Sequence, residues 1–180
     1  MKSKVVVVGT GIMGAGIAAG FIAQSIPVVI LGRSLEKAAT CLDKSVALAK
    51  KIGVDGDNAT KDEADIKKQQ VIGILENWHD WSNCSWVIET VAEDLELKKE
   101  VFKHLDKVVP PEVPIGSNSS GFPISKIAEG LATANRMMGA HYFMPAEVVP
   151  LVEIVMGEKT DIRFAQEACQ LYKDLNKKPV

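Results

Sequence analysis

The chain has 180 residues, 47% hydrophobic and 24% charged, with a formal net charge of −2. This length suits one domain with its own core, and the near-neutral charge gives no electrostatic case for binding nucleic acid or an anionic membrane. Cys41, Cys84 and Cys169 are far apart and lack the spacing of a disulfide or metal framework. We therefore expect free thiols, no metal site and a reducing, cytoplasmic location.

The first predicted elements are a strand, a tight turn and a helix. The β-branched run Val5–Val8 predicts a strand buried on both faces at the centre of a parallel sheet. Gly9, Gly11 and Gly14 follow it with the spacing G-x-G-x-x-G, which lets the backbone turn and approach a pyrophosphate at a helix N-terminus. The expected cofactor contacts of this turn are Gly9, Gly11, Ile12, Met13 and Gly14.

The same stretch has a second interpretation as a targeting or membrane segment, because Lys2 and Lys4 precede the uncharged residues Val5–Ala23. Its glycines, which include Gly16 and Gly20, argue against a spanning helix. We expect no targeting or transmembrane segment, and we expect Gly14, Gly16 and Gly20 to let the helix lie close to the sheet.

Strands and helices alternate through most of the remaining chain. Further strands are predicted at Pro27–Leu31, Val71–Leu75, Ser85–Thr90, Ile115–Asn118, Arg136–Phe143 and Leu151–Val155. Helices are predicted at Leu35–Lys51, Asp94–Val108, Pro123–Leu131 and Asp161–Leu175. Ile52–Gln70 lacks an apolar pattern and predicts a loop and a solvated helix, and a last strand begins near the C-terminus. This alternation predicts an α/β fold with a Rossmann-type, doubly wound, mostly parallel sheet in a single domain.

Four segments together resemble the NAD-binding N-terminal domain of the 3-hydroxyacyl-CoA dehydrogenase family. They are Gly9–Ala18, Glu89–Phe102, Ser117–Ile124 and Gly139–Val155, and the resemblance covers nearly the whole chain. The last segment is the most specific, because a His and a Glu on neighbouring strands around a Pro-bounded turn are not a general Rossmann feature. The stretch EDLELKK is also similar to the lambda-crystallin and gulonate dehydrogenase branch.

The resemblance implies roles for individual side chains. His141 matches the catalytic histidine, Glu153 its orienting carboxylate, and Ser120 the serine that contacts the substrate oxygen near the nicotinamide. Glu93 and Lys98 match positions that line the ribose and nicotinamide side of the cofactor. Oxidation of a secondary alcohol needs a base for the hydroxyl proton, and an imidazole oriented by a carboxylate supplies one. On spacing alone, a buried histidine satisfied by a neighbouring acid is the alternative.

The sequence departs from the family pattern at two places. Gly32, Arg33 and Ser34 stand where the family usually has an acid that binds the adenosine ribose. One interpretation is that Arg33 and Ser34 contact the cofactor, which is NAD, and allow NADP to be accepted as well. The alternative is that Arg33 is a solvated residue at a turn and that the cofactor is NAD. Met144 replaces the usual Asn after the two aromatic residues, which weakens the inference of an acyl-CoA substrate.

The family implies hydride transfer between NAD(P) and the 3-hydroxy group of a 3-hydroxyacyl-CoA, a small-molecule substrate of fatty acid metabolism. The alternatives are a dehydrogenase of a small hydroxy acid without CoA, and a dinucleotide-binding module without catalysis. The family also has a helical C-terminal domain that supplies much of the dimer interface, and residues 1–180 lack it. We therefore expect an isolated domain with little activity, and a homodimer only with that second domain.

Overall fold

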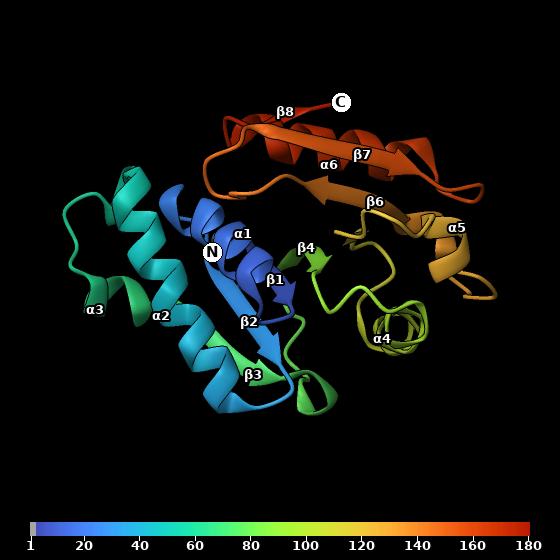
Figure 1. Ribbon diagram of the computed structural model, residues 1–180, viewed down its shortest axis with the longest axis horizontal. Coiled ribbons are helices and arrows are strands. Elements are labelled where there is room, and N and C mark those ends of the chain that lie inside the picture. The colour runs from blue at the N-terminus through green and yellow to red at the C-terminus, as the bar shows by residue number, and fades with distance from the viewer. Residues whose placement is uncertain (1–2) are drawn as a thin grey trace.

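The computed structural model describes residues 3–180, so Lys2 lies outside it. Within this range one sheet has the strand order β3-β2-β1-β4-β5-β6-β7-β8 (Figure 1). The strands are β1 (Lys4–Val8), β2 (Val28–Gly32), β3 (Val71–Ile74), β4 (Cys84–Glu89), β5 (Ile115–Ser117), β6 (Met137–Tyr142), β7 (Leu151–Met156) and β8 (Lys178–Pro179). Neighbouring strands are parallel except β6 and β7. The predicted Rossmann-type, mostly parallel sheet is confirmed.

Helices cover both faces of the sheet. They are α1 (Ile12–Ala23), α2 (Leu35–Ile52), α3 (Glu63–Lys67), α4 (Leu95–Val108), α5 (Ile124–Ile127) and α6 (Ile162–Asp174). Figure 1 shows α1 and α2 on one side of β1 and β2, and α4 on the other. Val5 and Val7 belong to the core cluster of α1, α2 and α6, whereas Val6 and Val8 belong to that of α4 and α5. Strand β1 is therefore buried on both faces, as its valine run predicts.

Strands β2 and β3 are added to the sheet on one side of β1, and the strands from β4 onward are added on its other side, so the order of addition reverses at β1. Strand β2 lies on one side of it and β4 on the other, and the chain reaches them through α1 and, later, through the connection that follows β3. In open α/β sheets, ligands bind beyond the carboxyl ends of the strands at such a reversal. The fold therefore places the glycine turn after β1 at the expected ligand-binding edge.

Most predicted elements begin and end within a residue or two of the observed ones, with two exceptions. Helix α5 ends at Ile127 rather than Leu131, and the left-handed backbone of Gly130, with φ of +75°, belongs to the turn that follows. In the segment 52–70, Ile66 of α3 is fully buried, so that helix is not solvated all round. The strand predicted near the C-terminus is confirmed, because β8 pairs with β7.

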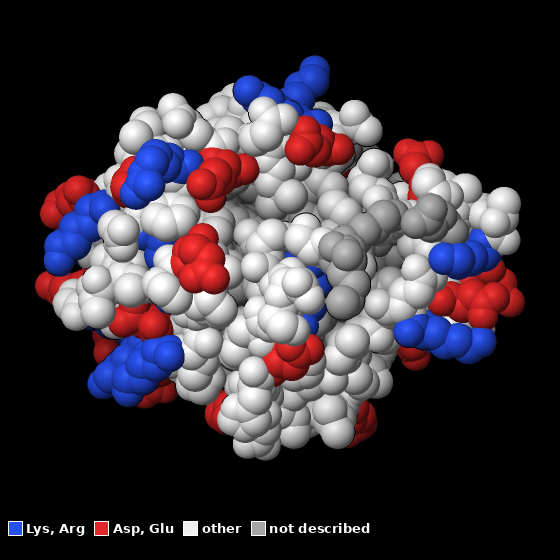
Figure 2. All heavy atoms as spheres, turned by 180° about the vertical axis from the view of Figure 1, so that it is seen from behind, with Lys and Arg blue, Asp and Glu red and all other residues white. Residues whose placement is uncertain are grey.

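The surface carries charges of both signs. On the face drawn in Figure 2, Lys and Arg side chains are interspersed with Asp and Glu. No helix within residues 3–180 combines the length and the apolar character needed to cross a membrane.

Candidate active site

The glycine turn after β1 forms a tight backbone bend. Gly9 has φ of +123°, and a Cβ there would lie 2.7 Å from the carbonyl of Thr90. A Cβ on Gly14 would lie 2.3 Å from the carbonyl oxygen of Gly9, whereas one on Gly11 would meet nothing within 4 Å. Because Gly9 and Gly14 have no Cβ, the turn can pack directly against Thr90 and the start of α1. The space next to Gly11 is open. This arrangement fits a pyrophosphate approaching the backbone.

The start of α1 is free to bind an anion. Gly11 is its N-cap and provides no side-chain hydrogen bond, and the first turn carries no acidic residue. The amides of Ile12 and Met13 begin the helix, and the exposed side chain of Ile12 points to solvent. Unpaired amides and the helix dipole favour a phosphate at this position.

Two other glycines of α1 do not act as expected. A Cβ on Gly16 would lie 2.6 Å from the Glu147 carboxylate, so Gly16 admits the connection between β6 and β7 rather than the sheet. A Cβ on Gly20 would meet nothing within 4 Å. Of the three glycines, Gly14 makes the close approach, and it contacts the turn after β1.

His141 and Glu153 form a hydrogen-bonded pair on adjacent strands. They are register partners on the antiparallel strands β6 and β7, and Nδ1 of His141 lies 2.9 Å from Oε2 of Glu153. Their side chains are 22% and 44% exposed, so solvent reaches both. A carboxylate accepts hydrogen bonds, so the proton of a neutral ring lies on Nδ1 and the Nε2 lone pair is left available. The predicted proximity of these side chains is confirmed.

A cavity of about 380 Å³ brings five of the expected site residues together. Its lining includes Met13, Glu93, Lys98, Ser120 and His141, which come from four separate segments of the chain. Because these residues lie far apart in sequence, the cavity itself is a product of the sheet topology. Its position beyond the ends of β4, β5 and β6 is that of a ligand site in this fold class.

Glu93 holds the loop that carries Ser120. Its Oε1 accepts hydrogen bonds from Ser119 Oγ at 2.5 Å and from the Gly121 amide at 3.2 Å. Partial burial by itself raises the pKa of Glu93, but these hydrogen bonds and the nearby Lys98 together hold the pKa below its usual range. The Glu93 carboxylate is therefore ionised at neutral pH.

Lys98 lines the cavity, and its ammonium group is paired with two carboxylates. The side chain projects from α4, is 1% exposed, and places Nζ 2.8 Å from Glu89 Oε1 and 3.4 Å from Glu93 Oε2. A buried ammonium needs such partners because isolation from water is costly. Contact between Lys98 and the cofactor remains a prediction.

Glu89 is the site residue that the sequence interpretation missed. It ends β4 and is fully buried, with hydrogen bonds from Lys98 Nζ, from Ser117 Oγ at 2.7 Å and from the Val91 amide at 2.6 Å. Burial raises the pKa of its carboxyl group, and the hydrogen bonds and the charge of Lys98 oppose that effect. The available signal was an acid at the end of the apolar strand sequence SWVIE.

Arg33 and Ser34 lie beside the glycine turn rather than in this cavity. A Cβ on Gly32 would lie 2.7 Å from the Thr10 side chain, so the end of β2 abuts the turn after β1. Ser34 caps α2 by accepting a hydrogen bond from the Lys37 amide at 3.3 Å, and Arg33 is exposed. Both residues therefore lie at the end of β2, next to the place where the adenosine ribose of a dinucleotide binds in this fold class.

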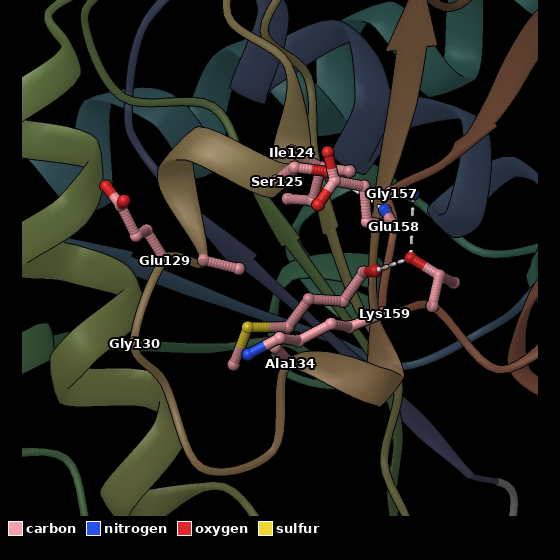
Figure 3. A pocket seen from close by; sticks show the side chains of 11 residues that line it. Ile124, Ser125, Glu129, Gly130, Ala134, Gly157, Glu158 and Lys159 are labelled. Carbon is pink, nitrogen blue, oxygen red and sulfur yellow. Dashed lines mark hydrogen bonds between the residues drawn. The ribbon is translucent and has the colours of Figure 1, made fainter.

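A second cavity lies at the other end of β6 (Figure 3). Its polar groups serve the fold, since Thr160 Oγ1 donates to the Met137 carbonyl and Ser125 Oγ accepts from the Glu158 amide. Glu129 points toward α4, and its Oε2 lies 4.0 Å from Nζ of Lys99 on that helix. None of the expected site residues lines this cavity. Within residues 3–180, no cluster of three or more His, Cys, Asp and Glu side chains could hold a metal ion.

Comparison with known proteins decides the family. Residues 4–180 match the family described as "3-hydroxyacyl-CoA dehydrogenase, NAD binding domain". The chain belongs to this family. The chain is 33% identical, over 98% of its length, to a peroxisomal fatty acid beta-oxidation multifunctional protein of Arabidopsis thaliana. It is 29% identical, again over 98%, to the 3-hydroxybutyryl-CoA dehydrogenase of Clostridioides difficile.

Solved structures agree with this assignment. The (S)-3-hydroxybutyryl-CoA dehydrogenase of Ralstonia eutropha matches all of the chain with a TM-score of 0.86 and 28% identity, and the chain covers 63% of it. The chain spans 24% of the Arabidopsis relative and 62% of the Clostridioides relative. The family is that of NAD-binding oxidoreductase domains, and the relatives are longer proteins that contain such a domain.

Proposed function

We propose that this domain binds NAD and transfers hydride between it and the 3-hydroxy group of a 3-hydroxyacyl-CoA. The observation that carries the proposal is the hydrogen bond of 2.9 Å between His141 Nδ1 and Glu153 Oε2 at a cavity near the glycine turn. Relatives named 3-hydroxybutyryl-CoA dehydrogenase support this choice of substrate class.

The chemistry assigns one task to each side chain. A nicotinamide bound in this cavity would supply the hydride acceptor or donor. Nε2 of His141 takes the hydroxyl proton of the substrate, and Glu153 stabilises the imidazolium that results. Ser120, which also lines the cavity, donates to the substrate oxygen. Glu93 orients the loop that carries Ser120 and faces the ribose and nicotinamide side of the cofactor.

Acceptance of NADP is part of the proposal. Gly32, Arg33 and Ser34 leave the end of β2 without the acid that would repel a 2′-phosphate. The Arg33 guanidinium is exposed beside the start of α2 and can pair with that phosphate, while Ser34 can donate to it.

Met144 favours a second candidate, a dehydrogenase of a small hydroxy acid without CoA. The side chain is 66% exposed and lines the cavity of His141, so an apolar group stands at the rim where the family usually has an amide. A substrate panel that includes acetoacetyl-CoA, acetoacetate and a small diketo acid separates the two candidates by their rates.

Histidine variants of the protein test the catalytic proposal. We expect His141→Ala to lower the rate of acetoacetyl-CoA reduction by about 10² to 10⁴ while the NADH dissociation constant changes little. His79→Ala, at an exposed histidine, is the matched control and should leave both quantities unchanged. An equal loss of NADH binding and of rate in His141→Ala would indicate the alternative, a structural histidine.

The setting of the domain completes the proposal. A homodimer is proposed only where the chain is joined to the helical second domain that the family resemblance implies, which would also form part of the acyl pocket. The free thiols of Cys41, Cys84 and Cys169 support a reducing compartment such as the cytoplasm.

A further inference from the structure

Glu89 has a place in the site that no catalytic task explains. We infer that it is a positioning residue, which fixes the loops around the nicotinamide half of the cofactor site and leaves the adenosine half untouched. The inference rests on the proposed binding of a nicotinamide dinucleotide. It follows from what the carboxylate contacts, because Glu89 itself is fully buried and does not line the cavity.

The carboxylate joins three segments that are distant in sequence. Oε1 accepts from Lys98 Nζ of α4 at 2.8 Å and from the Val91 amide, in the loop after β4, at 2.6 Å. Oε2 accepts from Ser117 Oγ, at the end of β5, at 2.7 Å. An ionised carboxylate has acceptor sites for all three donors, so one side chain sets the relative positions of these segments.

Two of these three partners, Lys98 and Ser117, pass the constraint on to the loop that carries Ser120. Lys98 also lies 3.4 Å from Glu93, which holds the Ser119 hydroxyl and the Gly121 amide on either side of Ser120. Ser117 Oγ accepts a hydrogen bond from the Ser119 amide at 3.2 Å. Two routes from Glu89 therefore end at the loop that carries Ser120.

The backbone of Glu89 extends the constraint to the catalytic strand. Its carbonyl accepts from the Asn118 amide at 2.9 Å, and Asn118 Oδ1 accepts from the Tyr142 amide at 2.8 Å. Tyr142 directly follows His141 on β6. Glu89 thus connects the loops after β4 and β5 with the strand of His141, whereas Arg33 and the glycine turn receive none of these hydrogen bonds.

Two ligands distinguish positioning from general stability. NADH occupies both halves of the site, whereas ADP-ribose contains the adenosine, the pyrophosphate and the second ribose but lacks the nicotinamide ring. Glu89→Gln keeps the shape of the side chain, and its amide can donate to Ser117 Oγ while its oxygen accepts from Lys98 and Val91. We expect Glu89→Gln to raise the dissociation constant of NADH by about tenfold, the effect of losing one charge-assisted hydrogen bond. The dissociation constant of ADP-ribose should change by less than about twofold.

Asp106→Asn is the matched control. Asp106 is an acid on α4, the helix that carries Lys98; it accepts hydrogen bonds from the amides of Ala132 and Thr133 and does not line the cavity. The variant should lower thermal stability without changing the ratio of the two dissociation constants. Ser117→Ala should shift that ratio in the same direction as Glu89→Gln, and it decides the test where Glu89→Gln does not fold.

The outcomes separate this inference from the proposed function. Equal weakening of NADH and ADP-ribose by Glu89→Gln and Ser117→Ala, or no change in either ligand, would overturn the positioning role. Failure of the unmodified protein to bind either ligand would instead overturn the proposed dinucleotide site. Selective loss of NADH affinity in the variants, with the control unchanged, supports the inference.

Discussion

We expect Arg33, which lies beside the glycine turn, to influence whether the site prefers NADPH or NADH. Arg33→Ala should raise the dissociation constant of NADPH by about tenfold to a hundredfold and leave that of NADH nearly unchanged. This factor corresponds to the loss of one solvent-exposed pair between Arg33 and the phosphate, worth roughly 1 to 3 kcal/mol. Arg33→Asp should go further, since it adds an acid that repels the 2′-phosphate and accepts from the ribose hydroxyls. Dissociation constants for both cofactors at one salt concentration measure this.

Lys44→Ala, a change to a distant exposed lysine on α2, is the control for general electrostatic attraction. The alternative is that Arg33 is a solvated residue at a turn and that the domain uses NAD, as the family usually does. NADH binding at least as tight as NADPH binding, with a ratio that Arg33→Ala leaves unchanged, would show that Arg33 does not select the cofactor.

Helix α1 offers two glycines with opposite expected effects. Gly14→Ala would place a Cβ 2.3 Å from the Gly9 carbonyl oxygen, so the turn must shift. We expect a loss of about 2 kcal/mol or more in the free energy of unfolding, and weaker binding of NADH. Gly20→Ala has open space around its Cβ and should stabilise the helix by about 0.5 to 1 kcal/mol.

Urea unfolding of the two glycine variants, with NADH titrations, measures both effects. Gly20→Ala controls for the change in helix propensity, because both substitutions lie within the same helix. Similar changes in the two variants would mean that the contact between Gly14 and Gly9 does not constrain the turn.

The start of β1 is tied to the loop before β4 by an ion pair with a defined pH dependence. Lys4 Nζ lies 2.7 Å from Asp80, and hydrogen bonds from Lys4 and then from Ser82 lower the pKa of Asp80 to about 2. The folded pKa is below the unfolded one, so the stabilisation is present above the usual pKa of about 3.9 and is lost as the pH falls toward 2.

Asp80→Asn removes this pH dependence. We expect the difference in free energy of unfolding between the unmodified protein and Asp80→Asn to shrink as the pH is lowered from neutral through the acid range. Urea unfolding at several pH values, at constant ionic strength, gives this difference. A difference that stays constant with pH would contradict the role of the ion pair.

For the whole molecule, we expect residues 1–180 alone to bind NADH and to turn over acetoacetyl-CoA slowly. The glycine turn, Glu93 and Lys98 all lie within the chain, but Glu153 and Met144 beside the cavity are 44% and 66% exposed. Water therefore reaches the proposed reacting groups, and its exclusion normally strengthens their electrostatic interactions.

Rates and NADH affinities of this chain, compared with those of a protein that also carries the family's helical domain, measure the effect. Equal NADH affinity with a much lower rate is the expected result. A rate typical of the longer enzyme, in a chain verified to end at Val180, would contradict this expectation.

The sequence by itself determined the features that short segments encode. The valine run and the glycine spacing predicted β1, the turn and α1, because strand and helix patterns repeat within a few residues. The segments around His141 and Glu153 predicted two strands with both side chains at one site. The family assignment followed from the same segments, and the match over residues 4–180 confirms it.

Only the tertiary structure decided which side chains meet across the sheet. Glu89 and Lys98 pair because the end of β4 faces α4, and Ser117 joins them because β5 is the next strand in the sheet. Gly14 differs from Gly20 because the Gly9 carbonyl lies against one and open space against the other. Such contacts depend on strand order, register and helix docking, which emerge when distant segments pack and which no local pattern of residues specifies.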